Sequence, residues 1–406
     1  MNKINLAVVF DQKIYSGGGY QQSITAALIA KKLPNNLVHV DFYTTEKENL
    51  KVLKNFEISA KLIKLGFFSK IRTFLYRKIK DKYIFKIFRF IEKANPREKF
   101  FLRDNIDLVY FLSPTSWPLD LENINYITTV WDLCHLDNPE FPEVRVNREF
   151  ERRENIYEGI LKKATAVIVD SKHTLFNITN KYRLDENRVY ISPFQSSYGI
   201  RNSINNLNYE KIDIKKKFQI KTPYIFYPAQ FWSHKNHIYL LKGLKLLEEN
   251  YGVVVEVIFC GKDNGSLEHV KEQAFEMKLS DRVHILGFVS NFEIFEIYRQ
   301  ATALVMPTYF GPTNIPPLEA FEIGIPVIYS NIKGSKEQLG DAALYIDLKN
   351  PLSLANQLMR LLDDKNLKEK LISEGKKKAE YNNSIDRLNI LKSIIEDFKN
   401  KRDCWK

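Results

Sequence analysis

A lysine between two histidines is the first candidate for binding chemistry in this sequence. Lys235 lies in the segment Tyr227–His237, with His234 before it and His237 two residues after it. A helix is predicted to begin at Lys235. The amino end of a helix is already positive, so a cation there is favoured only when an anion must be held. The pattern predicts a phosphate site, and the alternative is a solvated surface lysine.

A second candidate is the segment Pro307–Ala320, which follows a predicted strand. Its loop is rich in Gly, Pro and Asn, and the backbone N–H groups of such a loop can bind phosphate. A helix is predicted to begin at Pro316, since proline suits a first helical turn. Glu319 then has two interpretations. It is either a charge stabilised by the helix dipole or a carboxylate that accepts hydrogen bonds from ribose hydroxyls.

A glycine triplet near the N-terminus is a third candidate. Gly17, Gly18 and Gly19 follow the apolar run Ile4–Phe10. Glycines between a strand and a helix let a backbone approach phosphate closely, although a plain turn has the same composition. The spacing is not that of a dinucleotide-binding loop, and no acidic ribose partner is evident, so a dinucleotide cofactor is not expected.

Polar residues also follow the predicted strand Ile124–Val130. Asp132 and His135 can hydrogen-bond a sugar on which Trp131 stacks. The alternative is a helix-capping aspartate with a surface histidine, and the sequence leaves the two open.

The elements that must position these motifs are alternating strands and helices. Their order predicts an α/β fold with two Rossmann-like domains facing across a cleft. The polar segment Asn202–Asn208 is predicted to be a linker. The predicted ranges are 1–201 for the first domain, 209–385 for the second, and 386–406 for a helix that can pack back on the first domain. All four motifs follow strands, which is where open α/β sheets bind ligands.

Charge is concentrated in one short segment. The chain has 406 residues and a net charge of +12, and Lys61–Phe100 contains 13 Lys and Arg, three acids and nine aromatic residues. This pattern predicts amphipathic helices that contact an anionic membrane surface, or else a core helix with a basic solvated face. Nucleic-acid binding is not expected, because no recognition motif accompanies the charge.

The spacing of the cysteines and the length of the apolar runs indicate the expected cellular compartment. The three cysteines form neither a disulfide framework nor a metal-binding spacing, so no metal is expected. No apolar run approaches the length of about 18 residues that spans a bilayer. We expect a cytoplasmic enzyme, peripheral on the inner face of the membrane.

Together these residues resemble glycosyltransferase family 4, the retaining enzymes of the GT-B fold. The resemblance is strongest over Val283–Asp347, and "SGGGYQQ" and "TTVWDLCHLDNPEFPEV" carry it in the first half. It implies an acceptor-side domain over 1–201 and a nucleotide-sugar-binding domain over 209–385. In the second domain it implies that Lys235 neutralises the donor diphosphate and that Glu319 holds the ribose. The implied catalytic residues are Asp132, His135 and Lys235, and the implied donor-binding residues are Gly18, Gly19, Gln230, His234, Lys235, Thr313, Asn314, Ile315 and Glu319.

The sequence departs from the family pattern at three positions. Gly311 stands where the family has the first Glu of its E-x7-E element, and Gln230 stands where it has an Arg. Trp131 replaces a His, with His135 close behind it. His234 is expected to restore part of the lost phosphate neutralisation.

The resemblance implies transfer of a sugar from a nucleoside diphosphate to a growing polysaccharide or lipid-linked glycan. A hexosyltransferase of cell-surface polysaccharide or lipopolysaccharide biosynthesis, such as a mannosyltransferase, is the expected class. Lys235, helix amino ends and loop amides would stabilise the departing diphosphate without a metal. The alternatives are a sugar-nucleotide epimerase of the same fold and a non-catalytic lipid- or glycan-binding relative.

Overall fold

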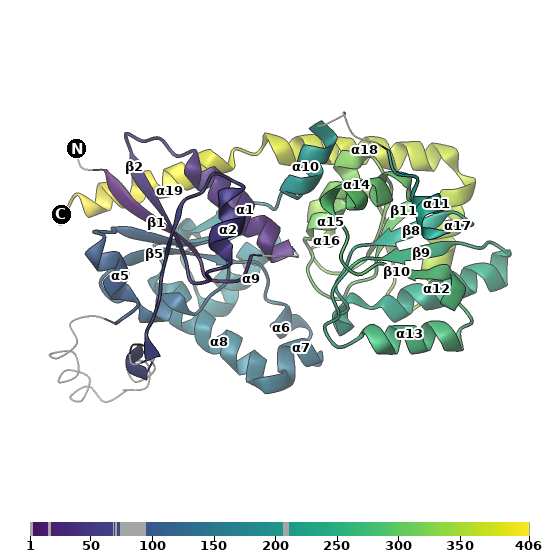
Figure 1. Cartoon of the computed structure of the whole chain (residues 1–406), viewed down its shortest axis with the longest axis horizontal. Coiled ribbons are helices and arrows are strands. Elements are labelled where there is room, and N and C mark those ends of the chain that lie inside the picture. The colour runs from purple at the N-terminus through teal and green to yellow at the C-terminus, as the bar shows by residue number, and fades with distance from the viewer. Residues whose placement is uncertain are drawn as a thin grey trace. The chain divides into compact units, whose positions relative to one another are not determined.

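The computed structural model describes residues 3–14, 18–67, 69, 71–73, 95–205 and 211–405. Within them the chain forms two compact units, each with its own parallel sheet (Figure 1). Unit 1 comprises residues 1–133, 151–193 and 386–406, and unit 2 comprises residues 134–150 and 194–385. These divisions differ from the predicted ranges, because the segment 134–150 packs with unit 2.

Unit 1 is built on a seven-stranded sheet in the order β3-β2-β1-β4-β5-β6-β7. Its pairs are parallel, and the central strands are apolar and buried because helices cover both faces of such a sheet. The strands are β1 (Ile4–Phe10), β2 (Val38–Thr44), β3 (Ala60–Leu62), β4 (Leu108–Phe111), β5 (Asn125–Val130), β6 (Ala166–Val169) and β7 (Val189–Ile191). The helices are α1 (Gly18–Lys31), α2 (Asn49–Lys54), α5 (Glu98–Arg103), η1 (Trp117–Asp120), α8 (Glu149–Ile160), η3 (Leu161–Lys163), α9 (Lys172–Tyr182), η4 (Glu186–Arg188) and α19 (Arg387–Arg402).

The C-terminal helix α19 belongs to the core of unit 1, where it lies beside α1. Its apolar face buries Leu391, Ile395 and Phe398 in the same cluster as β1. At its end, Arg402 forms a buried ion pair with Asp107 at 3.1 Å. A buried charge needs such a partner, so this pair anchors the helix to the start of β4.

Unit 2 has a six-stranded parallel sheet in the order β10-β9-β8-β11-β12-β13. Its strands are β8 (Tyr224–Tyr227), β9 (Glu256–Phe259), β10 (Val283–Ile285), β11 (Ala303–Met306), β12 (Val327–Ser330) and β13 (Ala343–Ile346). The strand order reverses between β8 and β11, and ligands of doubly wound sheets bind at the carboxyl ends of strands at such a switch point.

The helices of unit 2 connect these strands and cover the sheet. They are α6 (Cys134–Asp137), α7 (Pro142–Arg145), η2 (Val146–Arg148), α10 (Tyr198–Asn205), α11 (Ile214–Phe218), η5 (Ser233–Lys235), α12 (His237–Tyr251), α13 (Leu267–Glu276), η6 (Ser280–Arg282), α14 (Asn291–Gln300), α15 (Ile315–Ile323), α16 (Ser335–Leu339), η7 (Gly340–Ala342), α17 (Leu352–Asp363) and α18 (Lys365–Ser384).

Two local predictions are wrong. The predicted linker 202–208 is helical as far as Asn205, because α10 buries Ile200 in the core of unit 2. The helix predicted to begin at Lys235 begins at His237 instead. Asn236 adopts a left-handed conformation with φ of 57°, which separates the turn η5 from α12.

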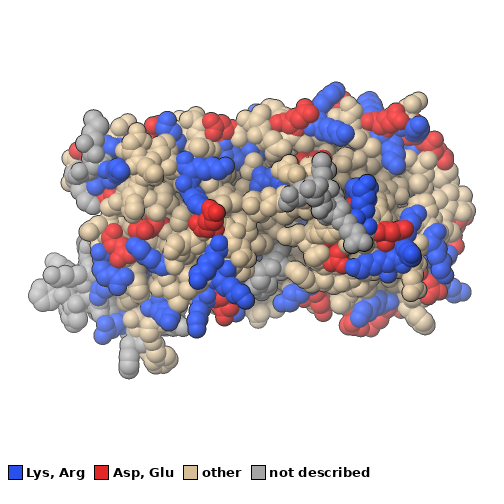
Figure 2. Space-filling model, turned by 45° about the horizontal axis from the view of Figure 1, so that its top comes forward, with Lys and Arg blue, Asp and Glu red and all other residues tan. Residues whose placement is uncertain are grey.

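The basic segment Lys61–Phe100 lies largely outside the described residues, so its predicted membrane contact stays a prediction. On the face shown in Figure 2, the Lys and Arg side chains drawn in blue are interspersed with Asp and Glu. Among the residues that the structure describes, no helix is both long and apolar enough to cross a membrane.

Candidate functional site

Two segments that follow neighbouring strands carry the predicted phosphate-binding residues. β8 and β11 pair in parallel, with Ala303 opposite Ile225, so the segments after them emerge at the same edge of the sheet. The backbone N–H of Tyr309 donates to the carbonyl of His234 at 2.9 Å. The turn η5 and the loop after β11 are therefore joined, although more than seventy residues separate them in sequence.

Lys235 is the last residue of η5 and is partly exposed. Its carbonyl accepts a hydrogen bond of 2.9 Å from the hydroxyl of Tyr227, a fully buried residue at the end of β8. This bond fixes the turn to the strand. The lysine thus precedes α12 by two residues, near the positive end of the helix.

Of the two histidines near Lys235, His237 is in the core. It is 2% exposed and stacks on Phe231 with ring centroids 4.5 Å apart. Burial, together with the charge of Lys235, lowers the pKa of His237 to about 3. His237 is therefore neutral at physiological pH and supplies no charge to an anion.

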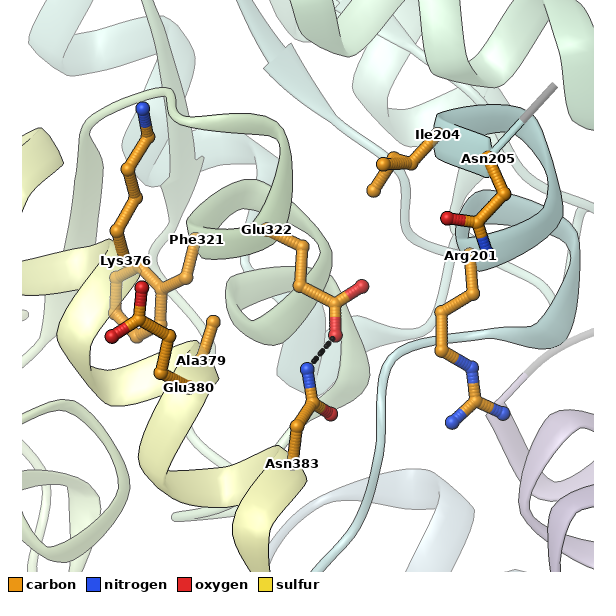
Figure 3. Close-up of a pocket in the computed structure, with 9 residues that line it drawn as sticks. All are labelled: Arg201, Ile204, Asn205, Phe321, Glu322, Lys376, Ala379, Glu380 and Asn383. Atoms are coloured by element: carbon orange, nitrogen blue, oxygen red, sulfur yellow. Dashed lines mark hydrogen bonds between the residues drawn. The ribbon is translucent and has the colours of Figure 1, made fainter. Parts of the chain in front are cut away.

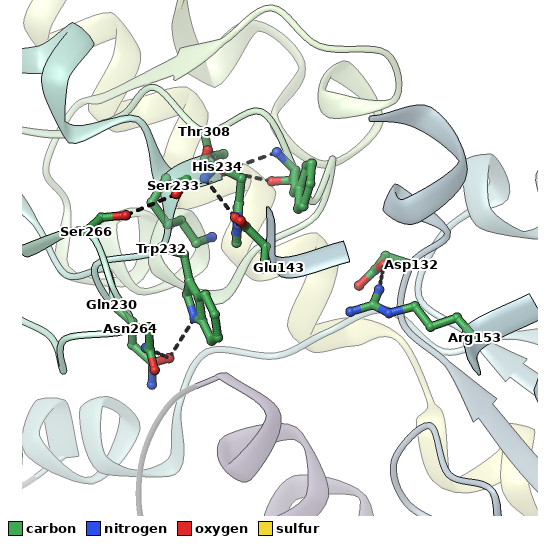
Figure 4. Close-up of polar contacts among 12 residues, drawn as sticks. Asp132, Glu143, Arg153, Gln230, Trp232, Ser233, His234, Asn264, Ser266 and Thr308 are labelled. Atoms are coloured by element: carbon green, nitrogen blue, oxygen red, sulfur yellow. Dashed lines mark hydrogen bonds and ion pairs between the residues drawn. The ribbon is translucent and has the colours of Figure 1, made fainter. Parts of the chain in front are cut away.

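His234 is held by a carboxylate and an aromatic ring (Figure 4). Glu143, from α7, accepts hydrogen bonds from the His234 backbone N–H at 2.9 Å and from its ring Nδ1. The Phe310 ring stacks on the imidazole at 4.3 Å. Burial alone would raise the pKa of Glu143, but the hydrogen bonds from His234 outweigh it and lower that pKa below its ordinary value. Glu143 is consequently a carboxylate at neutral pH.

The loop after β11 is closed by its own side chains. Gly311 has a φ of 74°, and a Cβ built there would lie 2.9 Å from the Asn314 side chain. The Asn314 amide donates to the Gly311 carbonyl at 2.6 Å, and its backbone N–H donates to Gln338 at 3.0 Å. The missing Glu of the family pattern therefore has a physical reason, since this loop conformation favours glycine. The backbone N–H of Asn314 is also already engaged within the protein.

Glu319 is buried on α15, with 8% of its surface exposed. It is the fifth residue of that helix, which corrects the first-turn position predicted from the sequence. The hydroxyl of Tyr298 donates to its Oε2 at 2.7 Å. Burial raises the pKa of Glu319, while hydrogen bonds from Ser197 and Tyr298 oppose that rise. Because dipole effects fade beyond the first turn, the interpretation as a helix-start charge fails.

The predicted residues of the first half fall in both units. In unit 1, Gly18 and Gly19 are the first residues of α1, and Gly17 lies outside the described residues. A Cβ at Gly19 would meet the Trp131 ring at 2.9 Å, so close packing explains that glycine. Asp132, also in unit 1, pairs with Arg153 at 3.5 Å. His135 belongs to α6 of unit 2 and is fully buried against Phe150, which corrects its surface interpretation.

The comparisons with known proteins agree with this geometry. Residues 208–378 match the family described as "Glycosyl transferases group 1". The matched segment covers less than half of the chain and contains η5, the loop after β11, and Glu319.

Two relatives of this chain are named as O-antigen chain mannosyltransferases. The O-antigen chain mannosyltransferase RfbU of Salmonella typhimurium is 28% identical over 187 residues, which are 46% of this chain and 48% of that protein. The chain thus spans about half the length of that relative. O-antigen chain mannosyltransferase B of Escherichia coli is 25% identical over 282 residues, which are 69% of this chain and 71% of that protein.

Solved structures share the fold of the whole chain. The Anabaena protein Alr3699/HepE in complex with UDP-glucose has a TM-score of 0.71 at 15% identity, over 98% of this chain and 100% of that one. WaaG, a glycosyltransferase involved in lipopolysaccharide biosynthesis, has a TM-score of 0.65 at 15% identity, over 97% and 98% of the two chains. The predicted class of two Rossmann-like domains of the GT-B type is confirmed.

Sequence reasoning missed three residues near the predicted ones. Glu143 and Phe310 hold His234, yet Glu143 is 91 residues away in sequence and no spacing rule links the two. In unit 1, Asp11 follows β1 directly and accepts a hydrogen bond of 2.9 Å from Ser113. Burial raises the pKa of Asp11. An acidic residue at a strand end was the available signal for Asp11.

A cavity of about 400 Å³ lies elsewhere in unit 2, among α10, α15 and α18 (Figure 3). Arg201 and Glu322 line it, and Glu322 accepts a hydrogen bond from Asn383 at 3.1 Å. The described residues contain no group of three or more His, Cys, Asp or Glu that could hold a metal ion. Metal-independent chemistry remains a prediction.

Proposed function

We propose that this protein is a glycosyltransferase that moves a sugar from a nucleoside diphosphate to a growing polysaccharide or lipid-linked glycan. One observation carries the proposal. The turn that ends in Lys235 is hydrogen-bonded to the loop after β11 at the switch point of the segment that matches group 1 glycosyl transferases, where doubly wound sheets bind ligands.

Two ionisable side chains, Lys235 and Glu319, bind different parts of the nucleotide in the proposed donor site. Lys235, followed by the amino end of α12, binds the diphosphate, and His234 adds a second polar contact. Glu319, which already accepts hydrogen bonds from Tyr298 and Ser197, is proposed to accept hydrogen bonds from the ribose as well. The names of the solved neighbours support a nucleotide-sugar donor, since one was solved with UDP-glucose.

Transfer breaks the bond between the sugar and the phosphate, and negative charge grows on the departing diphosphate. A fixed ammonium group and helix amino end stabilise that charge without reorganising. We infer retention of configuration, with the departing phosphate accepting the proton of the acceptor hydroxyl, so that no protein nucleophile is needed. From the resemblance we also propose donor-binding roles for Gly18, Gly19, Thr313 and Ile315 and catalytic roles for Asp132 and His135.

The names of two relatives support a proposal about the acceptor, and the basic segment supports a proposal about the location of the protein. Two relatives are named as O-antigen chain mannosyltransferases, so we propose surface polysaccharide biosynthesis and a mannosyl donor as the first to test. We also propose that the basic segment Lys61–Phe100 contacts an anionic membrane at its cytoplasmic face.

The test measures release of nucleoside diphosphate. The full chain is incubated with GDP- and UDP-sugars, with and without a polyprenyl-linked oligosaccharide acceptor, and we expect release that depends on the acceptor. Lys235→Ala removes a charge-assisted contact worth about 1.5–3 kcal/mol, so release should fall roughly ten- to hundredfold. Lys242→Ala is the matched control, because Lys242 is exposed on the same helix α12.

Each other outcome contradicts a part of the proposal. Wild-type turnover in Lys235→Ala would exclude this donor site. Conversion of the nucleotide sugar without release of the nucleotide would indicate an epimerase. Binding of the nucleotide sugar without any release would indicate a non-catalytic protein.

A further inference from the structure

A second cavity of unit 2, of about 450 Å³, lies beside the turn η5. Its walls come from the segment 142–149, the residues that precede η5, and the loop after β9. Its polar and aromatic lining residues are Glu143, Asn147, Glu149, Trp232, Ser233 and Asn264. A volume of this size lies in the range of small-molecule sites.

One wall of this cavity is an aromatic ring in a fixed position (Figure 4). The indole N–H of Trp232 donates to the side-chain oxygen of Gln230 at 3.1 Å, and the Asn264 amide lies 2.9 Å from the same oxygen. The backbone next to the ring is also held in place, because the backbone N–H of Phe231 donates a hydrogen bond to the carbonyl of Lys262 at 3.0 Å. Gln230, which stands at the arginine position of the family pattern, therefore also positions Trp232.

The loop after β9 approaches this backbone too closely for a side chain. A Cβ built at Gly261 would lie 2.2 Å from the carbonyl oxygen of Ala229. Glycine is required at such an approach, so the two loops pack backbone against backbone. The hydrogen bonds and this packing place the aromatic wall before any ligand arrives, and such preorganisation reduces the entropy lost on binding.

Among its described lining residues the cavity offers no Lys or Arg with which an anion could pair. Two carboxylates, Glu143 and Glu149, line it, and Glu143 is already paired with His234. A diphosphate or a uronic acid would therefore find no counter-charge in this lining. A neutral sugar fits these groups, because its hydroxyls donate to carboxylates and its C–H face packs on an indole ring.

The backbone at the end of the segment 142–149 is unusual. Asn147 and Arg148 both adopt left-handed conformations with φ of 58°. The neighbouring Val146 is an exposed apolar residue, with 56% of its surface accessible. Non-glycine residues in this conformation store strain, which is common at binding sites.

We propose that this cavity binds a neutral sugar residue of the acceptor glycan, with Trp232 as the stacking surface and Asn264, Asn147 and Glu149 as hydrogen-bonding partners. The assignment rests on the proposed function. The loop that matches the donor-binding element of the family, Gly311–Ile315, does not line the cavity. Ser233 does line it, two residues before Lys235, so the bound sugar would lie next to the donor phosphate.

The test uses saturation-transfer NMR on the full chain with methyl glycosides of mannose, glucose, galactose, rhamnose and N-acetylglucosamine, and with glucuronic acid. We expect at least one neutral glycoside to bind and glucuronic acid to bind less. Trp232→Ala and Asn264→Ala should weaken that binding about tenfold or more. Trp232→Phe, which keeps an aromatic face, should retain most of it and covers the case in which the alanine variant does not fold. Trp405→Ala is the matched control, since Trp405 is 61% exposed near the C-terminus.

Calorimetry with UDP and GDP separates this inference from the proposed function. Trp232→Ala should bind the nucleoside diphosphate like the wild type, whereas Lys235→Ala should lose it and still bind the glycoside. The inference is overturned if no neutral glycoside binds the wild type, or if Trp232→Ala binds it equally well. Displacement of the glycoside by bound nucleotide sugar would also overturn it, because the cavity would then hold the sugar of the donor.

Discussion

Replacing Glu143 by glutamine tests whether this carboxylate holds the turn that carries Lys235. Glu143 accepts two hydrogen bonds from His234, and the two side chains are only 9% and 12% exposed. A hydrogen bond to a charged group contributes about 1.5–3 kcal/mol. Glutamine keeps the shape but loses the charge, so the free energy of unfolding of unit 2 should fall by about that amount. For a unit of this size the melting temperature should fall by roughly 3–12 °C.

The same pair determines the sign of a pH effect. The folded pKa of Glu143 lies below its ordinary value of 4.5, so the unfolded chain binds more protons between the two values. The stabilisation is therefore fully present above pH about 4.5 and is lost as the pH falls through the lower folded pKa. Wild-type unit 2 should lose this contribution on acidification, and Glu143→Gln should not.

Differential scanning calorimetry near neutral pH and again below pH 4.5 measures both effects. Glu140→Gln is the matched control, because Glu140 is exposed in the same segment. The reasoning is refuted if Glu143→Gln melts with the wild type near neutral pH, since the carboxylate would then contribute nothing to holding His234.

Three further predictions concern the donor site and the membrane. Glu319→Gln should keep the fold and weaken nucleoside diphosphate binding about tenfold or more, because a charged acceptor is lost; unchanged affinity in calorimetry would leave Glu319 a packing residue. Gly311→Glu should not raise activity and should cost about 1–3 kcal/mol of unfolding free energy, because φ is 74° and Asn314 blocks the Cβ; a stable, faster variant would contradict the strain argument. Liposome co-sedimentation should rise with anionic lipid and fall in high salt, since each basic residue contributes about 1 kcal/mol. Liposome binding should largely disappear when glutamate replaces Lys78, Lys82, Lys86 and Arg89. If the wild type does not co-sediment with anionic liposomes at low salt, the membrane contact is excluded.

Local patterns predicted the strand before Pro307, because it is a short apolar run that a loop rich in Gly, Pro and Asn follows. Tyr224–Tyr227 and Ala303–Met306 are buried throughout, and parallel strands covered on both faces must be apolar. The order of motifs along the chain also predicted which segments follow which strands. The start of α12 was misplaced, since composition does not reveal that Asn236 adopts a left-handed conformation.

The sequence did not allow us to predict which side chains contact each other across the fold. His234 and His237 are equivalent neighbours of Lys235 in sequence, yet one is held by Glu143 and the other is buried among aromatic rings. Gly311 and Gln230 read as losses from a family pattern. In the structure, Gly311 satisfies a backbone conformation and Gln230 holds Trp232.

The sequence by itself determined the α/β class, the two domains and the strand ends where chemistry is placed, because these depend on periodic burial and on residues adjacent in the chain. Only the tertiary structure decided that residues 134–150 pack with unit 2, and that Glu143 and Trp232 form one cavity beside the turn before α12. Such contacts depend on how strands are ordered and loops are packed. The residues around a side chain in the sequence do not identify a partner that lies about ninety residues away.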